Sequence, residues 1–483
     1  ARVPSSPHFH GQSSLDETLA TVEAALQAGA IAAIKASWGF DLVCDATNGE
    51  AVRRLRTAKG TVLPLALMVR NGAIARQYAS VGDLEAQALQ QPGAPIVILN
   101  AQPQSSAPSQ QESQTSPLAP GIRPPGSITA VQNTLGIMLP PNTLYQRLLE
   151  RLDHPLMVTS GNLAGGVPGV DNHQVRLQLE AIADYFLMNN QPVTHSVEAS
   201  VVQVLSFPAE SEAKSLHQAS HQVPRQDLEA PASAQQLQVI RRSRGQASTL
   251  IRLPRGFETA PPILAMGPTF DNTIALLRRN HAVLSRHLGH LDTASGLQAY
   301  QAALNHHRHL WNFDPKLVAV EAHPDYHPTK LGREWHQDAH PTVAVQHHHA
   351  HLAACLIDNQ IPLTTAPVLA LVLDDFGYGD DGTLWGGELL WGSYQSLVRL
   401  GSLRPVPLPA NRLKRRHPWP WALTQTLTQS RPHTSSIGWL LGEVAVTMGL
   451  VRDTDSHGLL LLEGLAHQEL SKRPAALSDL SPQ

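Results

Sequence analysis

Apolar residues in the first part of the chain follow two alternating spacings. From Ser14 to Ala28 they recur with the period of an amphipathic helix, and Glu17, three residues after Ser14, fits a capping box at its start. Short apolar runs at Ile31–Ile34 and Leu65–Val69 predict buried strands, and residues 48–55 predict another helix. Helices that alternate with short strands predict an α/β domain.

The later part of the chain predicts a second α/β region. It has the order of an actin/hexokinase-like nucleotide-binding lobe, because three adjacent strands precede alternating helices and strands. Val368–Leu373 is strongly apolar and predicts a central strand. The other expected strands are residues 263–266, 273–277, 282–285, 317–320 and 343–345, and the expected helices are residues 293–310 and 347–356.

Two polar stretches and a proline-rich segment divide the chain. Residues 102–117 and about 208–236 contain little to bury and are expected to be disordered insertions. Three prolines between Leu253 and Pro262 predict a boundary. We therefore expect one domain over residues 1–253 and a second over residues 262–483.

The composition is that of an ordinary globular protein. Hydrophobic residues make up 42% of the 483 residues, charged residues 16%, and the formal net charge is -3, so no global charge draws the chain to nucleic acid or to anionic lipid. Cys44 and Cys355 are too few for a disulfide framework and favour a reducing compartment. Residues 1–14 do not have the pattern of a signal peptide, and no apolar run is long enough to cross a bilayer, so a cytoplasmic location is expected.

Histidine is unusually common, with 25 residues, more than half of them between His281 and His351. Most are expected to lie on a solvated surface. His347 and His351 differ, because a spacing of four places two imidazoles on one face of a helix, where they can share a metal ion. A solvated histidine cluster remains the alternative, since such a pair is a common pattern.

Other polar groups have the chemistry of phosphate sites. Lys35 ends a predicted strand and Thr159, Ser160 and Asn162 surround a glycine turn; alone, such a turn is ordinary. Arg241, Arg242 and Arg244 fit the phosphate of an adenylate or of nucleic acid, or else form a solvated basic face. The glycines near Asp381 allow backbone N–H groups to approach phosphate and also fit a plain β-hairpin. These glycines are Gly377, Gly379, Gly382, Gly386 and Gly387.

Nine segments resemble the HypF family, which carbamoylates a partner during [NiFe] hydrogenase maturation. Those that resemble its YrdC-like domain, which makes an acyl-adenylate from ATP, are Ala33–Asp45, Gly136–Pro140, Val158–Asn162 and Arg241–Gly245. Those that resemble its carbamoyl-transfer domain are Leu317–Tyr326, Val345–His351, Leu373–Gly379, Asp381–Glu388 and Thr434–Gly438. The resemblance covers nearly the whole chain, and the order of the domains favours this family over the antibiotic carbamoyltransferases.

The resemblance implies a reaction and its partners. Carbamoyl phosphate is hydrolysed, the carbamate is adenylated with ATP and Mg²⁺, and the carbamoyl group passes to the C-terminal cysteine of a HypE-like acceptor. The chain is expected to lack the family's acylphosphatase and zinc-finger parts, which a separate piece would supply, and the end of the transfer domain. Binding of double-stranded RNA is implied by the YrdC resemblance alone.

The resemblance also implies roles for individual residues. His347, His351 and Asp374 are metal ligands for Zn²⁺ or Fe²⁺, and Lys35 and Asp374 act in catalysis. The nucleotide- and phosphate-binding residues are Lys35, Lys59, Thr159, Ser160, Asn162, Arg242, Arg244, Gly377 and Gly379.

Several polar positions depart from the family pattern while the apolar framework is kept. They are Thr61, Leu63, Ala94, Glu198-Ala199, Asp271, His290, Asp375-Phe376 and Trp439. Each lost cation would remove a charge-assisted bond of roughly 1.5–3 kcal/mol to a bound triphosphate. Two hypotheses follow: a carbamoyltransferase with weakened or split sites, and a non-catalytic remnant or scaffold. A tRNA threonylcarbamoylation enzyme is a third, weaker hypothesis.

Overall fold

The computed structural model describes residues 15–59, 65–102, 134–162, 168–206, 235–337, 341–407, 433–437 and 441. The two expected insertions lie outside these residues, except residue 102 and residues 235–236; Thr61, Leu63 and Trp439 also lie outside. The described residues up to Gln246 form one compact unit, and those from Ala247 onward form a second.

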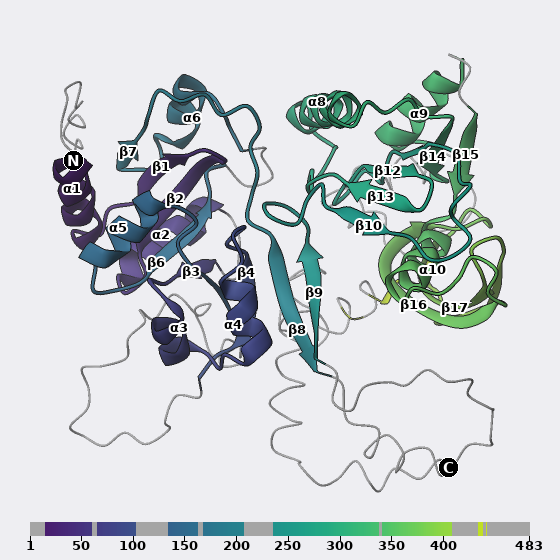
Figure 1. Cartoon of the computed structure of the whole chain (residues 1–483), viewed down its shortest axis with the longest axis horizontal. Coiled ribbons are helices and arrows are strands. Elements are labelled where there is room, and N and C mark those ends of the chain that lie inside the picture. Colours follow the sequence, from purple (N-terminus) through teal and green to yellow (C-terminus); the bar gives the residue numbers. More distant parts are fainter. Residues whose placement is uncertain are drawn as a thin grey trace, which may run out of the picture. The chain divides into compact units, whose positions relative to one another are not determined.

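The first unit is a mixed sheet with helices on both faces (Figure 1). Its described strands are hydrogen-bonded in the order β7-β1-β2-β6-β3-β5-β4-β8-β9. The strands are β1 (Ala32–Ala36), β2 (Gly39–Asp45), β3 (Ala66–Met68), β4 (Ile96–Asn100), β5 (Thr134–Met138), β6 (Leu156–Ser160), β7 (Tyr185–Leu187), β8 (Val201–Ser206) and β9 (Gln235–Arg241). The helices are α1 (Leu15–Gln27), α2 (Gly49–Lys59), α3 (Gly72–Tyr78), α4 (Asp83–Leu89), α5 (Thr143–Arg151) and α6 (Asn172–Leu179).

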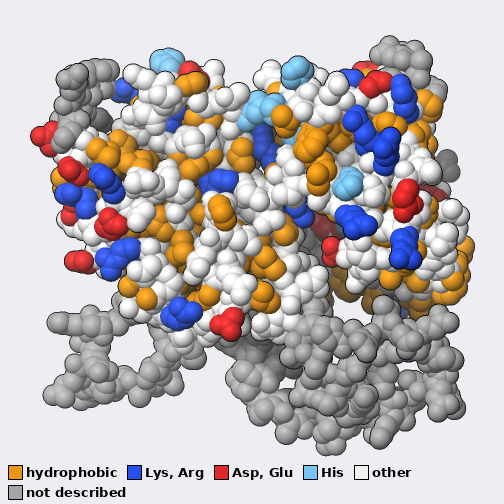
Figure 2. Space-filling view, viewed as in Figure 1, with side chains coloured by type: hydrophobic (Ala, Val, Ile, Leu, Met, Phe, Trp, Pro, Cys, Tyr) orange, Lys and Arg blue, Asp and Glu red, His pale blue; other side chains and the backbone are white. Residues whose placement is uncertain are grey.

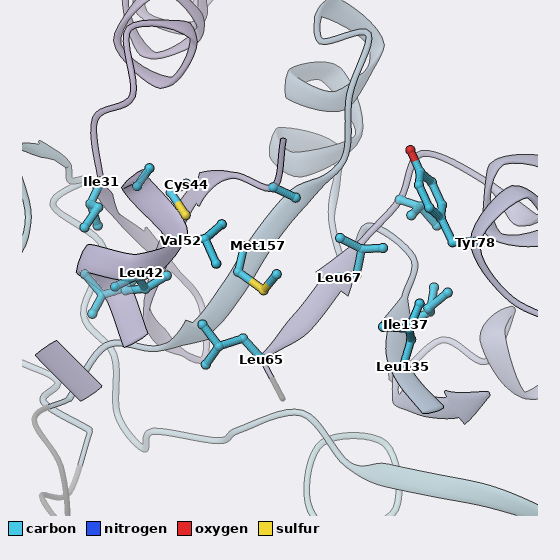
Figure 3. Packing of buried hydrophobic residues seen from close by; sticks show 14 of the residues in the cluster. Ile31, Leu42, Cys44, Val52, Leu65, Leu67, Tyr78, Leu135, Ile137 and Met157 are labelled. Carbon is cyan, nitrogen blue, oxygen red and sulfur yellow. The ribbon is translucent and has the colours of Figure 1, made fainter. Parts of the chain in front are cut away.

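The alternating side chains of the central strands build a core on each face of this sheet. On one face Leu42 and Leu67 pack with residues of α2, α3, α4 and α6, as part of the cluster in Figure 3. On the other face Ile34 and Val43 pack with residues of α1 and α5. Because both faces are covered, strands β1 and β3 are buried at every position, which removes the period-two alternation from their sequences.

The second unit contains two sheets. In the first, the described strands are ordered β10-β13-β12-β11-β14-β15, with β14 parallel to both neighbours. In the other, β17 pairs with β16, β18 and β20, and β20 with β19. The strands are β10 (Leu250–Arg252), β11 (Ile263–Ala265), β12 (Ala275–Arg278), β13 (His281–Leu284), β14 (Leu317–Glu321), β15 (Thr342–Val345), β16 (Val368–Tyr378), β17 (Leu384–Gly392), β18 (Leu397–Ser402), β19 (Val406–Pro407) and β20 (His433–Thr434). The helices are α8 (Ala294–Leu310), α9 (His327–Gln337) and α10 (His347–Asp358).

The elements expected from the apolar pattern are present, with two corrections. Val368–Leu373 belongs to a longer strand, β16, which lies at the end of its sheet among the described strands and is not central. Its apolar residues face outward at alternate positions, with Leu369, Leu371 and Leu373 more than half exposed. The unit boundary lies after Gln246, because β10 pairs with β13 of the second unit.

Charge and polarity on the surface agree with the small net charge. In Figure 2 the basic and acidic side chains are scattered among apolar and neutral ones on both units. Cys44, buried in the first core, and Cys355, which is exposed, are both free thiols. Among the described residues, no helix has the length and apolar character needed to cross a membrane.

Candidate metal and nucleotide sites

Helix α10 brings His347 and His351 together on one side, as their spacing requires. Gln346 caps the helix by accepting a hydrogen bond from the His349 backbone N–H through its side chain. The helix therefore starts at His347, and the Nε2 atoms of His347 and His351 lie 3.2 Å apart. Both atoms also face Asp374 Oδ2, at 3.0 Å from His347 and 3.5 Å from His351.

An irregularity in β16 positions Asp374. The antiparallel pairing of β16 with β17 is interrupted between Leu373 and Gly377, so the intervening residues leave the regular ladder. Helix α10 contacts β16, and Asp374 lies at this interruption beside the two imidazoles. Its buried Oδ2 faces the Nε2 atoms of both imidazoles, an arrangement that fits a shared cation.

Glu321, at the end of β14, orients His347 from the other side. The His347 Nδ1 atom lies 2.6 Å from Glu321 Oε1, to which it donates its proton. This contact directs Nε2 toward Asp374 and His351, the arrangement that proteins use to fix the tautomer of a metal-binding histidine. The sequence did not predict this residue, because Glu321 precedes His347 by 26 positions and follows an ordinary apolar strand.

The electrostatics of this cluster favour a positive charge between its carboxylates. Burial by itself would lower the pKa of His347, but hydrogen bonds to Asp374 and Glu321 outweigh it and raise that pKa to about 10. Burial would raise the pKa of Asp374, yet His347 and His351 hold it well below its ordinary range. A divalent cation would supply the same positive charge, and two imidazole nitrogens with one carboxylate oxygen suit Zn²⁺ or Fe²⁺.

His348 lies beside the cluster, but its side chain is buried and packs against Gly377. It is fully buried, and burial lowers its pKa to about 4, so the imidazole is neutral. The Gln346 side-chain oxygen accepts from His349, so its amide nitrogen donates to His348 Nδ1 at 3.0 Å. The same ring lies against Gly377, where a Cβ atom would come within 2.3 Å of His348 Cε1. Gly377 therefore gives His348 room.

The glycine-rich segment after Asp374 forms the hairpin between β16 and β17. Asp381 Oδ1 accepts hydrogen bonds from the Thr383 backbone N–H at 2.9 Å and from Trp385 Nε1 at 2.9 Å, and Gly382 has a positive φ of 75°. Gly379 lies so close to Trp385 that a Cβ atom would be 2.1 Å from the indole nitrogen. The structure therefore contains the β-hairpin that the glycines predicted. Phosphate binding by Gly377 and Gly379 stays a prediction.

A buried carboxylate, Glu388, joins this sheet to the segment around Ser435. Its side chain is fully buried, and Oε2 accepts from Arg399 Nε at 2.6 Å. Its Oε1 accepts from the Ser435 hydroxyl and from the Gly386 backbone N–H. Sequence reasoning assigned Glu388 no role, and only its place at the end of a glycine-rich segment singles it out.

The two lysines predicted for the first unit both bind protein groups. Lys35 Nζ donates to Asn172 Oδ1 at 2.6 Å and to the Asn189 carbonyl at 3.1 Å. Lys59 Nζ donates to the carbonyls of Ser160 and Asn162 at 3.0 and 2.9 Å and to Asn162 Oδ1 at 2.7 Å. Burial lowers the pKa of Lys59 to about 8. Lys59 therefore stabilises the Thr159–Asn162 turn through these hydrogen bonds.

A cavity of about 320 Å³ lies beside this turn, within the first unit. Thr159, Ser160 and Arg244 line it, whereas Lys35, Lys59, Asn162 and Arg242 do not. Arg242 Nη1 donates instead to the Gln246 carbonyl at 2.9 Å. The remaining polar lining residues are Asp41, Thr134, Glu198 and Arg241, which were not predicted as a set. The apolar lining includes Ile96, Met138 and Val158.

Comparison with known families divides the chain as the fold does. Residues 24–213 match the family model described as "Telomere recombination", which covers the YrdC-type domains. Residues 258–358 match "HypF Kae1-like domain", and residues 370–431 match "Carbamoyltransferase, Kae1-like Domain, second subdomain". The fold and these matches define a mixed α/β protein with a YrdC-like domain followed by a Kae1-like domain of the actin/hexokinase class.

Relatives that match most of this chain identify the family. The chain is 37% identical over 411 residues to a carbamoyltransferase HypF of Rhodobacter capsulatus, covering 85% of this chain and 49% of the relative. It is 34% identical over 395 residues to that of a Synechocystis strain, covering 81% and 45%. A crystal structure of full-length HypF in the phosphate- and nucleotide-bound form has a TM-score of 0.76 and 28% identity, covering 95% and 58%. The chain belongs to the HypF family, and it spans about half the length of the curated relatives it matches.

Proposed function

We propose that this chain carries out two steps of carbamoyl transfer in hydrogenase maturation. In the first, a carbamate oxygen attacks the α-phosphorus of ATP, pyrophosphate leaves, and carbamoyl-adenylate forms. In the second, the C-terminal cysteine thiolate of a HypE-like acceptor attacks the carbamoyl carbon, and AMP leaves. The carbamate would come from the hydrolysis of carbamoyl phosphate by an acylphosphatase.

The observation that carries this proposal is the convergence of His347, His351 and Asp374. Their ligand atoms all lie within 4.8 Å of one another. Glu321 supports His347 from behind, which a chance cluster of surface histidines would not require. Such a site fits the transfer step, in which negative charge develops on a carbonyl oxygen.

The chain's own residues would divide the work of the transfer step. His347 Nε2, His351 Nε2 and Asp374 Oδ2 would hold a divalent cation, and Glu321 would keep His347 in the tautomer that presents Nε2. When bound, the cation supplies Lewis-acid stabilisation of the developing oxyanion. The side chain of His351 is half exposed, which leaves one side of the cluster accessible to substrate.

For the adenylation step we propose the cavity of the first unit. Its volume of about 320 Å³ lies at the lower end of the range for small-molecule sites. Thr159 and Ser160 offer hydroxyl donors, and Arg241 and Arg244 offer guanidinium groups in the lining. Lys59 holds the turn that presents the hydroxyls, so its proposed role in nucleotide binding is to position Thr159–Asn162.

One observation favours the alternative, a protein that binds nucleotide or a maturation partner without turnover. Lys35 and Lys59, the two lysines expected to meet phosphate, already donate to protein acceptors. Binding of a triphosphate to either would require these bonds to break, which removes part of the gain in binding free energy.

ATP–pyrophosphate exchange separates the two functions. The chain would be incubated with carbamoyl phosphate, ATP and labelled pyrophosphate, with and without an added acylphosphatase. Exchange that depends on carbamoyl phosphate and the acylphosphatase would establish adenylation. Silence in both reactions, with ATP binding detected by calorimetry, would leave a scaffold that binds nucleotide. The absence of both exchange and binding at millimolar ATP would reject adenylation and nucleotide binding alike.

A further inference from the structure

Asp41 contributes a carboxylate to the lining of the cavity in the first unit. It lies on β2, in the lining of the cavity. Its Oδ2 accepts hydrogen bonds from the Tyr145 hydroxyl at 2.9 Å and from Trp38 Nε1 at 3.1 Å. Among the described residues, nothing donates to Oδ1. One oxygen is therefore anchored, and the other is available to a ligand.

Neighbouring rings hold this carboxylate in place. Trp38 and Tyr145 stack with centroids 6.4 Å apart, and the guanidinium of Arg244 lies 4.2 Å from the centroid of the Trp38 ring. Arg244 is fixed in turn by its hydrogen bond from Nε to the Gly93 carbonyl at 3.0 Å. The position of Asp41 is thus determined by three side chains before a ligand arrives, which reduces the entropic cost of recognition.

Hydrogen bonds and positive charge within the cluster oppose protonation of Asp41. Burial raises the pKa of Asp41 above its ordinary value, and the hydrogen bonds from Tyr145 and Trp38 and the charge of Arg244 limit this rise. Trp38 Nε1 can only donate, so Oδ2 must accept whatever the protonation state of the carboxyl group. The hydroxyls of Thr159 and Ser160 add donors to the same cavity, and Ile96, Ile98 and Val158 are among its apolar lining residues.

We propose that Asp41 determines substrate specificity, by accepting a hydrogen bond from an amino group of the substrate through Oδ1. This inference rests on the proposed function of the cavity. Two substrate groups share the required chemistry: the exocyclic amino group of an adenine base and the NH₂ of a carbamoyl group. Both are planar amino groups beside an sp² carbon.

The Asp41→Asn variant tests this directly. Because Tyr145 and Trp38 both donate to the anchored oxygen, the amide of Asn would keep its oxygen there and turn its NH₂ into the cavity. The variant would then reject an amino group and favour a carbonyl. A hydrogen bond to a charged acceptor corresponds to about a tenfold to hundredfold change in affinity.

Calorimetry with ATP and with ITP, which carries a carbonyl in place of the amino group, identifies which of the two amino groups Asp41 binds. If the base is read, the variant binds ATP at least about tenfold more weakly and ITP more tightly than wild type does. If the carbamoyl group is read, ATP and ITP binding stay unchanged, and the KM for carbamoyl phosphate in the exchange assay rises by a similar factor.

Unchanged ATP and ITP affinities together with an unchanged KM would overturn the role of Asp41 and leave the proposed function intact. Wild-type protein that neither binds nucleotide nor exchanges pyrophosphate would overturn both. The exposed Asp153, on the loop after α5, gives the matched control, because Asp153→Asn makes the same chemical change outside the cavity. Far-ultraviolet circular dichroism of both variants checks folding.

Discussion

At the scale of single residues, the convergence of His347, His351 and Asp374 was predictable in part, and the contact of Glu321 with His347 was not. The four-residue spacing of His347 and His351 is local, so any helix over them brings the imidazoles together. Asp374 was expected only from the resemblance, and an interruption in strand pairing turns it toward the helix. Glu321 comes from a different strand, and a contact of that kind leaves no periodic signal in the sequence.

Glu321→Gln should weaken metal binding without abolishing it. The Gln side-chain oxygen can still accept from His347 Nδ1 but carries no negative charge, so the contact that fixes the imidazole and raises its basicity is weakened. We expect zinc affinity, measured by competition with a chelating dye, to fall about 10- to 100-fold. Glu334→Gln on α9, an exposed position, is the control and should bind zinc like wild type. Equal affinities for the two variants would show that Glu321 does not support the site.

The charges around Asp271 predict a pH-dependent contribution to stability. The ion pair with His290, at 3.7 Å, lowers the pKa of Asp271 and raises that of His290, and His287 faces the same carboxylate at 3.6 Å. The aspartate's contribution is lost as pH falls through its lowered pKa, and the histidine's is lost as pH rises through its raised pKa. The pair therefore stabilises the fold most between the ordinary pKa values of 3.8 and 6.5.

Asp271→Asn tests this contribution, since Asn also tolerates the positive φ of 48° at this position. The variant should lower the thermal midpoint more at about pH 5.5 than at about pH 8.5. Because Asp271 is largely exposed, solvent screens the pair, and the loss should stay below about 1 kcal/mol and shrink in high salt. A loss of the same size at both pH values would contradict the pairing.

At the scale of elements, the spacing of apolar residues predicted most helices and strands, because helices and strands each have their own characteristic repeat of apolar positions. It failed for β16, whose continuous apolar run was interpreted as a central strand. In the structure Leu369 and Leu371 are 59% and 67% exposed, and β16 lies at the end of its sheet among the described strands. Periodicity cannot separate a strand covered on two faces from one with an apolar outer face.

Leu371→Ser should therefore change stability little, in spite of the residue's apolar character. Its side chain gains little from burial, so we expect a change in unfolding free energy within about 0.5 kcal/mol. Leu264→Ala on β11, where the side chain is fully buried, should cost about 2–5 kcal/mol. Urea unfolding of the two variants provides the comparison. A large loss for Leu371→Ser would mean that this face is covered in solution.

Packing of β16 against α10 predicts a further effect on metal binding. In Gly377→Ala the new Cβ would lie 2.3 Å from a ring carbon of His348 and 3.0 Å from the Cβ of His347. Either the helix or the strand must shift, so the ligand atoms separate and zinc affinity should fall at least about tenfold. Gly401→Ala on β18, which meets nothing within 4 Å, is the control. Unchanged zinc affinity in Gly377→Ala would show that the site tolerates the displacement.

At the scale of the whole molecule, composition and pattern predicted two α/β regions, and the family matches agree with them. The boundary was placed a few residues late, because prolines mark loops but do not reveal that β10 pairs across to β13. The cavity was predicted only in part, through Thr159, Ser160 and Arg244. Asp41 and Glu198 join it from distant strands and loops that only the folded sheet brings together.

The central claim is that the chain forms carbamoyl-adenylate in one unit and uses the His347–His351–Asp374 cluster of the other for transfer. Intact-mass spectrometry of a HypE-like acceptor tests it, after incubation with the chain, ATP, carbamoyl phosphate, zinc and an acylphosphatase. The account predicts one carbamoyl group on the acceptor's C-terminal cysteine with wild type, and none with His351→Ala, although that variant still exchanges pyrophosphate. An unmodified acceptor with wild type, or transfer at the wild-type rate by His351→Ala, would contradict it.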